Sequence, residues 1–352
     1  MKISEIGRRL IVGFDGLDVN NEIRFALREL GAGGVILFAR NYEEPAQLRE
    51  LVVRLRELCI HDRLWACVDQ EGGKVQRFSE PFTTWPDMAS FVQYGDLAKA
   101  QTFACYNARE LRAVGVDWNF APVADLNTCA QNPIIGRRSF SGDASEAAEY
   151  VEAVVRGFQS EGVMACAKHF PGHGDTRAHS HVELPVDERE ARRISEVEFI
   201  PFKAAARAGV ASIMTAHVQY PAFDEGLPAT FSSAIIAMAR EFPFDGLVVS
   251  DDLEMAAVAD RYGMADAGMM ATSAGCDILL CCHDVRRQEE IVRGLYDAVL
   301  SEKVPRRVIL DSAKRIQNAL VRFPNLKSPP LSEIGRNKHW DLAERVRSAS
   351  DV

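Results

Sequence analysis

Eight short apolar runs recur along the chain, and longer segments with helical periodicity separate most of them. The apolar runs span residues 10–14, 34–38, 64–68, 116–120, 164–167, 212–215, 247–250 and 277–281. The helix-like segments span residues 22–30, 46–58, 98–113, 144–159, 196–208, 265–274 and 288–301. Such alternation indicates parallel strands joined by crossover helices. Eight units of this kind predict an α/β fold, a (β/α)8 TIM-type barrel, and a doubly wound open sheet is the alternative.

Polar residues follow directly after several of the apolar runs. They are Asp69, Asp125, Lys168 with His169, His217, and Asp251 with Asp252. In a (β/α)8 barrel the carboxyl ends of all strands meet at one face, where functional residues gather. We therefore expect these side chains to surround a single site.

Composition and charge narrow the classes of partner and the compartment. The 352 residues are 47% hydrophobic and carry a formal net charge of −9, so a nucleic acid is not expected as a partner. The first residues lack the apolar stretch of a signal peptide, and no run approaches the ~20 apolar residues of a membrane span. These observations predict a cytoplasmic protein that does not contact a membrane. The sequence leaves the oligomeric state open.

The C-terminal part of the chain differs from the rest. A proline-rich stretch covers residues 324–330 and predicts the end of the barrel. We therefore expect a catalytic barrel over residues 1–323 and a C-terminal extension over residues 324–352, with a short helix around residues 340–348.

Eight cysteines lie mostly in apolar runs and lack the spacing of a disulfide framework. They are expected to be reduced core residues. The run Cys281-Cys282-His283-Asp284 has no second ligand pair at zinc-site spacing, so neither a metal nor another cofactor is expected there.

Four of the eight histidines lie within the fourteen residues from Lys168 to His181. The apolar run before them is strand-like, and Pro171, Gly172 and Gly174 then force an irregular loop. Crowding of groups that titrate or donate hydrogen bonds is hard to explain by packing. The segment therefore indicates a catalytic or binding loop at the end of a strand.

This segment, Lys168-His169-Phe170-Pro171-Gly172-His173-Gly174, resembles the signature of glycoside hydrolase family 3. Within that family it is similar to the single-domain β-N-acetylglucosaminidases of the peptidoglycan-recycling type, whose signature continues with Asp-Ser-His. Further matches are Asp69-Gln70-Glu71-Gly72-Gly73, Arg138-Ser139-Phe140 and Ser250-Asp251-Asp252-Leu253, and the resemblance covers nearly the whole chain. It implies a barrel that releases terminal β-linked N-acetylglucosamine from a small carbohydrate or muropeptide, through a covalent glycosyl-aspartate.

The resemblance also implies roles for individual residues. Asp251 corresponds to the nucleophile and His181 to the acid/base, which in this family is a histidine in place of the usual second carboxylate. The residues implied to bind the sugar are Asp69, Arg138, Lys168 and His169. Asp252 is assigned to capping the next helix, whereas Asp125 stays open between a sugar contact and an ion pair with an arginine at the barrel rim.

Position 179 departs from the family pattern. The family has an aspartate there, which orients the catalytic histidine and stabilises its cation, whereas this chain has His179. A neutral His179 could still hold His181, but a protonated one would lower the pKa of His181. Asp175 is a possible substitute. A slower enzyme, a rewired pair of histidines and an altered sequence all fit.

Three other activities follow from these patterns. The chain could be a β-glucosidase-like enzyme, or a weakly active or non-catalytic sugar-binding barrel, because of His179. His179-Ser180-His181 also resembles the His-x-His pair of barrel metallohydrolases, with His169, His217 and Asp251 as further ligands. In those enzymes the pair belongs to the first strand, whereas here it follows the fifth, so the metal-dependent reading is the least favoured.

Overall fold

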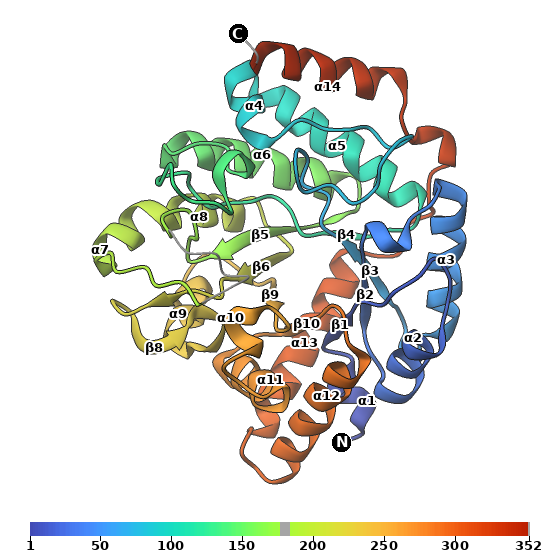
Figure 1. Ribbon diagram of the computed structural model, residues 1–352, viewed down its shortest axis with the longest axis vertical. Helices are drawn as coiled ribbons and strands as arrows, with labels where there is room; N and C mark the ends of the chain where they lie inside the picture. The colour runs from blue at the N-terminus through green and yellow to red at the C-terminus, as the bar shows by residue number, and fades with distance from the viewer. Residues whose placement is uncertain (177–183, 351–352) are drawn as a thin grey trace.

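The computed structural model describes residues 1–176 and 184–350. Its eight parallel strands close into a barrel in the order β1-β10-β9-β6-β5-β4-β3-β2 (Figure 1). The strands are β1 Leu10–Val12, β2 Gly34–Leu37, β3 Trp65–Val68, β4 Trp118–Asn119, β5 Met164–Phe170, β6 Ser212–Thr215, β9 Leu247–Asp252 and β10 Ile278–Cys281. Each coincides with one apolar run, so the predicted (β/α)8 barrel is confirmed and the open sheet is excluded.

Helices surround the barrel on all sides in Figure 1. The α-helices are α1 Ile3–Gly7, α2 Asn21–Phe25, α3 Pro45–Leu58, α4 Met88–Tyr94, α5 Leu97–Ala113, α6 Ala144–Ser160, α7 Ala191–Arg193, α8 Phe199–Arg207, α9 Ser233–Arg240, α10 Ala256–Ala259, α11 Met264–Ala274, α12 Val285–Leu300, α13 Arg306–Arg322 and α14 Asn337–Ser350. Short 3-10 or π turns occupy η1 Ala26–Leu30, η2 Ala39–Asn41, η3 Gly136–Arg138, η4 Ile194–Glu198, η5 Ala229–Phe231 and η6 Leu331–Glu333. None of the helices in the described ranges is long and apolar enough to cross a membrane.

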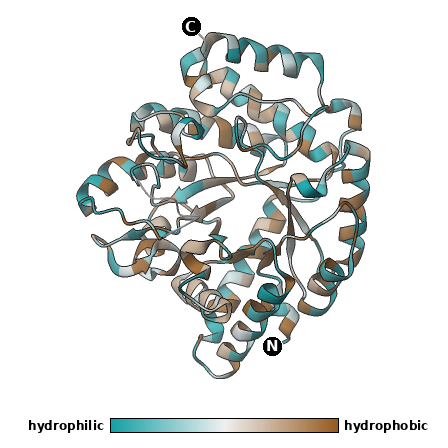
Figure 2. Ribbon diagram, in the orientation of Figure 1, coloured by the Kyte–Doolittle hydropathy of each residue, from teal (hydrophilic) through white to brown (hydrophobic). Residues whose placement is uncertain are grey.

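Local sequence signals explain where the longer helices begin. Asp96 accepts a hydrogen bond from the Lys99 amide at the start of α5, and Asp143 accepts one from the Glu146 amide at the start of α6. Each carboxylate satisfies an amide that has no partner within the helix. In Figure 2 the helices carry hydrophilic and hydrophobic bands along their length, as expected for elements with one face on a core.

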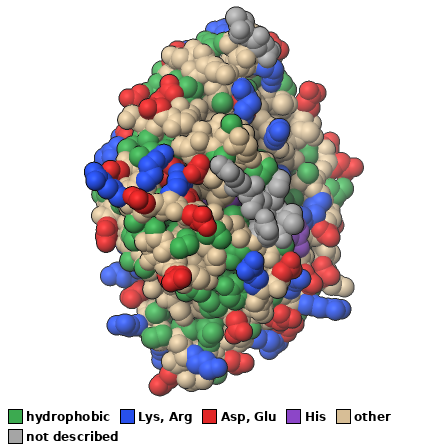
Figure 3. All heavy atoms as spheres, turned by 60° about the vertical axis from the view of Figure 1, so that its left-hand side comes forward, with side chains coloured by type: hydrophobic (Ala, Val, Ile, Leu, Met, Phe, Trp, Pro, Cys, Tyr) green, Lys and Arg blue, Asp and Glu red, His purple; other side chains and the backbone are tan. Residues whose placement is uncertain are grey.

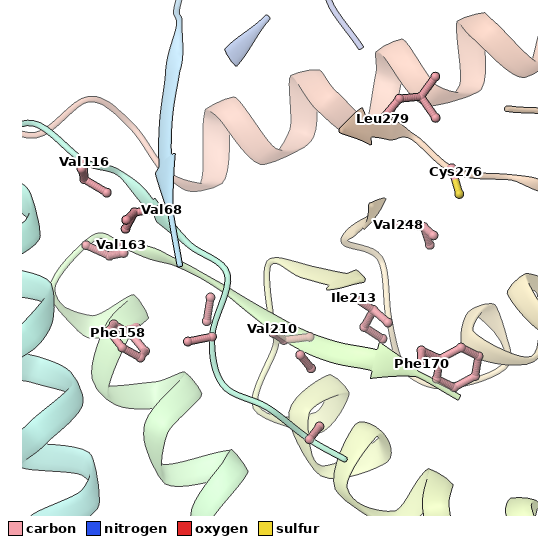
Figure 4. Close-up of a cluster of buried hydrophobic side chains, with 14 of the residues drawn as sticks. Val68, Val116, Phe158, Val163, Phe170, Val210, Ile213, Val248, Cys276 and Leu279 are labelled. Carbon is pink, nitrogen blue, oxygen red and sulfur yellow. The ribbon is translucent and has the colours of Figure 1, made fainter. Parts of the chain in front are cut away.

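Alternate strand residues build two separate cores. Val68, Ile213, Val248 and Leu279 point outward and pack against helical side chains such as Phe158 of α6 (Figure 4). Their neighbours in sequence point inward and fill the barrel, together with two tryptophans and Phe120. These inward residues include Cys67, Met214, Val249, Leu280, Trp65 and Trp118. Burial on both faces explains why each strand reads as a continuous apolar run.

Helix α13 closes the amino-terminal end of the barrel. Its Ile316 and Ala319, and Phe323 directly after it, belong to the interior core. Beside them Asp277 is fully buried and accepts from Arg240 Nη2 at 2.6 Å and Arg315 Nε at 2.7 Å. This end is therefore sealed by apolar packing and paired charges, and the open end lies at the carboxyl ends of the strands.

A small two-stranded sheet and the C-terminal helix lie outside the barrel. A two-stranded antiparallel sheet, β7 Gln219–Tyr220 and β8 Asp224–Pro228, lies beside the barrel and was not predicted.

In the C-terminal extension α14 lies against α4 and α5, at the top of Figure 1. There His339 Nδ1 is 2.7 Å from Glu110 Oε1, and both side chains are buried.

Candidate active site

A cavity of about 650 Å³ opens at the carboxyl ends of the strands. Its wall comes from segments far apart in the chain that follow different strands. The lining includes Phe38, Asp69, Glu71, Arg77, Arg138, Lys168, His169, His173, Asp251, Asp252, Cys282 and His283. Five residues expected from the sequence to act in one site, Asp69, Arg138, Lys168, His169 and Asp251, therefore share this cavity.

Two carboxylates and three cations form one network on the cavity wall, in which Glu71 and Lys168 are buried and the other members are partly exposed. Lys168 Nζ lies 2.7 Å from Asp69 Oδ1 and 2.6 Å from Glu71 Oε1. Arg138 contacts Glu71 through two nitrogens, Nε and Nη2, each 2.8 Å from a different carboxylate oxygen. The network holds the polar ends of Lys168 and Arg138 in fixed positions at the cavity.

Burial and pairing set the charge states in this network. Burial alone would raise the pKa of Glu71, but Arg138 and Lys168 outweigh it and hold that pKa well below its usual range. Burial likewise opposes the charge on Lys168, yet Asp69 and Glu71 raise its pKa above the usual value. Glu71 and Lys168 are therefore ionised at neutral pH.

Glu71 was not identified from the sequence as a site residue. Its side chain is 2% exposed and joins Lys168 to Arg138. A signal was available, because Glu71 is two residues after Asp69 and extended chain places such residues on the same side. Glycine follows at position 72, where φ is +111° and a Cβ would lie 2.6 Å from the Pro86 carbonyl oxygen. The Glu-Gly-Gly sequence thus lets the loop turn tightly beneath the cavity.

Asp125 lies beneath the cavity and orients His169. Its Oδ2 is 2.7 Å from His169 Nδ1, and its Oδ1 accepts from the His169 and His173 amides at 3.1 and 2.7 Å. The ion pair with an arginine was one of the two alternatives left open for Asp125, and His169 takes the place of that arginine. Burial would raise the pKa of Asp125, but His169 lowers it below its usual value. With Nδ1 directed at this carboxylate, Nε2 of His169 remains to face a ligand.

His173 also lines the cavity and was not singled out as a site residue. Its Nδ1 lies 2.7 Å from Thr176 Oγ1. Burial, assisted by the neighbouring His169, lowers the pKa of His173 to about 4, so the ring is neutral at physiological pH. The next residue, Gly174, packs directly against the carbonyl group of Leu126. A Cβ added to Gly174 would lie 1.5 Å from that carbonyl oxygen. The glycine of this motif is thus required by a backbone contact.

Asp251 and Asp252 end β9 at the cavity. Asp251 Oδ1 accepts from the Asp252 amide at 2.8 Å. Although burial would raise the pKa of Asp251, His169 and His217 lower it, so this carboxylate is ionised. Asp252 Oδ1 accepts from the Glu254 amide at 3.0 Å, in the turn before α10. Burial raises the pKa of Asp252 to about 7, with Glu254 and Asp251 adding to the shift. The two adjacent aspartates therefore differ in charge below neutral pH.

The expected acid/base His181 and its neighbour His179 lie outside the described residues. Asp175, considered as a substitute partner, is in the described part, where its Oδ2 lies 3.1 Å from Arg189 Nε. The same arginine contacts Asp187 Oδ2 at 2.6 Å and Glu198 Oε1 at 2.5 Å. Arg189 thus joins residues on both sides of the segment between Asp175 and Asp187.

The Cys281-Cys282-His283-Asp284 run contributes Cys282 and His283 to the cavity wall. Burial raises the pKa of the Cys282 thiol well above its usual value, so the thiolate is disfavoured. His283 stacks on Phe38 with ring centroids 5.7 Å apart. Within residues 1–176 and 184–350, no three or more His, Cys, Asp or Glu side chains are grouped to hold a metal ion.

Comparisons with known proteins agree on one family. The model of the glycosyl hydrolase family 3 N-terminal domain matches residues 2–319. A β-hexosaminidase of Nitrosomonas eutropha is 40% identical over 294 residues, which cover 81% of this chain and 84% of the relative.

Solved structures are similar over almost the whole chain. A glycoside hydrolase family 3 β-N-acetylglucosaminidase from Paenibacillus sp. str. FPU-7 is 35% identical with a TM-score of 0.94, covering 99% of this chain and 69% of that one. NagZ from Neisseria gonorrhoeae, in complex with N-trifluoroacetyl-D-glucosamine, is 30% identical with a TM-score of 0.79, covering 97% and 98%.

Proposed function

Because the chain belongs to glycosyl hydrolase family 3, we propose that it is a retaining β-N-acetylhexosaminidase that releases terminal β-linked N-acetylglucosamine. One observation carries the mechanism. The ionised carboxylate of Asp251 lies at a strand tip in the same cavity as the network of Asp69, Glu71, Lys168 and Arg138. A rigid nucleophile beside fixed donors and acceptors is what glycosyl transfer to a carboxylate requires.

The network is suited to hold the sugar ring. Asp69 Oδ atoms accept hydrogen bonds from hydroxyl groups, while Lys168 and Arg138 donate to hydroxyl oxygens from positions fixed by Glu71. His169 Nε2 adds a further polar contact, because Asp125 holds the other ring nitrogen. Orientation by several fixed groups places the anomeric carbon before Asp251 and reduces the entropic part of the barrier.

The reaction proceeds in two displacements. Asp251 attacks the anomeric carbon while the bond to the leaving oxygen breaks, and His181 gives its proton to that oxygen. Water then attacks the anomeric carbon, His181 takes a proton from the water, and the Asp251 carboxylate departs with its electron pair. A histidine suits both steps because its ordinary pKa of ~6.5 allows it to lose and regain a proton near neutral pH.

The substrate proposed is a peptidoglycan turnover fragment. Support comes from the names of the relatives, from the N-acetylglucosamine analogue bound to the Neisseria gonorrhoeae protein, and from the Pro171-Gly172-His173-Gly174 loop. We place the reaction in the cytoplasm, because all eight cysteines, each in the described part of the chain, are free thiols.

Two measurements test the function. The protein should release chromophore from an aryl β-N-acetylglucosaminide much faster than from the matching β-glucoside. A fluorinated N-acetylglucosamine inactivator should add one glycosyl unit to the peptide that contains Asp251. Binding of the sugar without turnover would favour a sugar-binding barrel, preference for the glucoside would favour a β-glucosidase, and label on Asp69 or Asp125 would overturn the nucleophile.

A further inference from the structure

We infer that His217 is a positioning residue for the nucleophile, which it aims by holding the backbone of an irregular strand tip. The inference rests on the proposed function only in taking Asp251 as the nucleophile. Its evidence is a bulge in β9, two side chains that bond to the backbone at that bulge, and a buried hydroxyl group that fixes the imidazole.

Strand β9 contains one residue more than its partner at the point where Asp251 lies. Val249 is opposite Ile278, but Asp252 is opposite Leu280, so three steps along β9 match two steps along β10. In a regular strand, successive side chains point to opposite faces. Here both Asp251 and Asp252 line the cavity. The bulge therefore turns an additional carboxylate toward the site, as bulges beside active sites commonly do.

At the bulge, side chains form hydrogen bonds with backbone groups of β9 and β10. The Leu280 amide donates to Ser250 Oγ at 3.0 Å. On the other side of Asp251, the Asp252 carbonyl oxygen is 2.9 Å from His217 Nε2. The carbonyl oxygen can only accept, so Nε2 carries the hydrogen. Asp251 is thus flanked by two residues whose positions depend on these bonds.

The imidazole of His217 is itself held firmly. The side chain is buried, and Nδ1 lies 2.8 Å from Thr230 Oγ1. Thr230 Oγ1 is in turn 3.1 Å from the Ala216 carbonyl oxygen and 3.0 Å from Thr215 Oγ1. Residues at the end of β6 and in η5 therefore fix the position of the ring that contacts β9. A buried hydrogen-bonded chain of this kind gives one defined geometry.

His217 also favours the ionised form of Asp251. Burial would raise the pKa of that carboxylate, and His169 and His217 are the two groups that lower it most. Loss of His217 should therefore displace the nucleophile and raise its pKa. A displacement of about 1 Å at a reacting group can cost about 10²-fold in rate.

The test compares His217→Ala with His217→Gln. Glutamine keeps an Nε2–H donor on a side chain of similar reach, whereas alanine removes it. His61→Ala is the matched control, because His61 Nε2 lies 2.8 Å from the Gly31 carbonyl oxygen, before the start of β2 and away from the cavity. The readout is the rate of covalent labelling by a fluorinated N-acetylglucosaminyl fluoride, whose leaving group needs little protonation.

The expected result is a ~10- to 100-fold slower labelling of His217→Ala, a similar loss in kcat with little change in KM, and partial recovery in His217→Gln. His61→Ala should label at the wild-type rate. Labelling of His217→Ala at the wild-type rate, or no difference between alanine and glutamine, would overturn the inference. Absence of label on Asp251 in the wild-type protein would instead overturn the proposed nucleophile.

A second variant decides the question if His217→Ala does not fold. Thr230→Val removes the hydroxyl group at Nδ1 while leaving the imidazole and a side chain of nearly equal volume. Circular dichroism and thermal unfolding first establish that the variant is folded. Labelling should then be at least several-fold slower than in the wild-type protein, and an unchanged rate would count against the positioning role.

Discussion

Glu71 and Arg138 meet through two parallel contacts, with Arg138 Nε and Nη2 each 2.8 Å from a separate oxygen of the Glu71 carboxylate. Paired geometry of this kind is stronger and more directional than a single contact. The carboxylate also accepts from Lys168 Nζ at 2.6 Å. One buried anion therefore fixes two cations that are proposed to bind the sugar.

Glu71→Gln should destabilise the protein and weaken substrate binding. Removal of this charge leaves Lys168 with Asp69 as its remaining carboxylate contact and deprives Arg138 of the carboxylate that it meets through two nitrogens. Breaking a buried pair typically costs about 3–5 kcal/mol. Urea unfolding measures the loss. Glu196→Gln, which removes an exposed partner of Arg192, is the control and should change the free energy of unfolding by less than about 1 kcal/mol. Equal effects of the two substitutions would contradict the role of Glu71.

Asp125→Asn should make the stability of the protein depend less on pH in the acidic range. The pKa of Asp125 is lowered in the folded state, so its stabilisation is present above the ordinary value of ~3.9 and is lost as pH falls through the folded value. The wild-type protein should therefore lose more stability than the variant when acidified below about pH 4. Thermal unfolding between pH 2.5 and 7 checks this, with the exposed Asp245→Asn as control. Parallel profiles for Asp125→Asn and the wild type would refute it.

Asp252→Asn should have the opposite pH dependence. The pKa of Asp252 is raised to about 7 in the folded state, so folding takes up a proton between about pH 4 and pH 7. Wild-type stability should fall across this window and stay reduced above it. The variant should be more stable than the wild type by ~1–3 kcal/mol at pH 8, and the difference should shrink toward pH 4. A constant difference across this range would show that the carboxyl group does not titrate as described.

Exhaustive chelation should leave the rate of N-acetylglucosaminide hydrolysis unchanged. The proposed mechanism uses a carboxylate and a histidine, and each step transfers a proton or forms a bond to Asp251 without a metal ion. The measurement is the initial rate before and after dialysis against a strong chelator. Loss of activity that zinc restores would replace this mechanism with a metal-dependent one.

His179→Asp should raise turnover, above all on substrates with poor leaving groups. An aspartate at this position would orient His181 and stabilise its cation, and general acid–base assistance is worth roughly 10²–10⁴-fold. The pH optimum should shift upward, because an anion beside His181 raises its pKa. Paired rates on an activated aryl glycoside and on an alkyl glycoside measure the effect. Lower activity on both would mean that His179 contributes positively, in a rewired pair with His181.

Sequence patterns were sufficient for the barrel because each of its strands is buried on both faces. Residues such as Val248 and Val249 pack into different cores, so every strand became a continuous apolar run. The sheet formed by β7 and β8 gave no such signal, because its residues include Asp224, Glu225 and Gly226 and are partly exposed. Local polarity there resembles that of an ordinary loop.

It was harder to predict which residues of the site contact each other than to predict which residues lie in it. Strand-end positions indicated Asp69, Lys168, His169 and Asp251, since barrel closure brings all strand ends to one face. Barrel closure does not determine which charged side chains pair with each other. Asp125 and His169 are 44 residues apart, and Glu71 and Arg138 are 67 apart, so their pairing depends on loop paths that no short motif encodes.

Arg189 joins Asp175 to Asp187 and Glu198, which secures the barrel on both sides of the segment that carries positions 179 and 181. Substitutions at these positions leave the ion pairs on both sides of the segment in place. A residue at position 179 can be exchanged, and its effect on the rate measured, while these ion pairs are retained. The segment is thus a place where evolution can vary the proposed acid/base chemistry while the residues proposed to bind the sugar are kept.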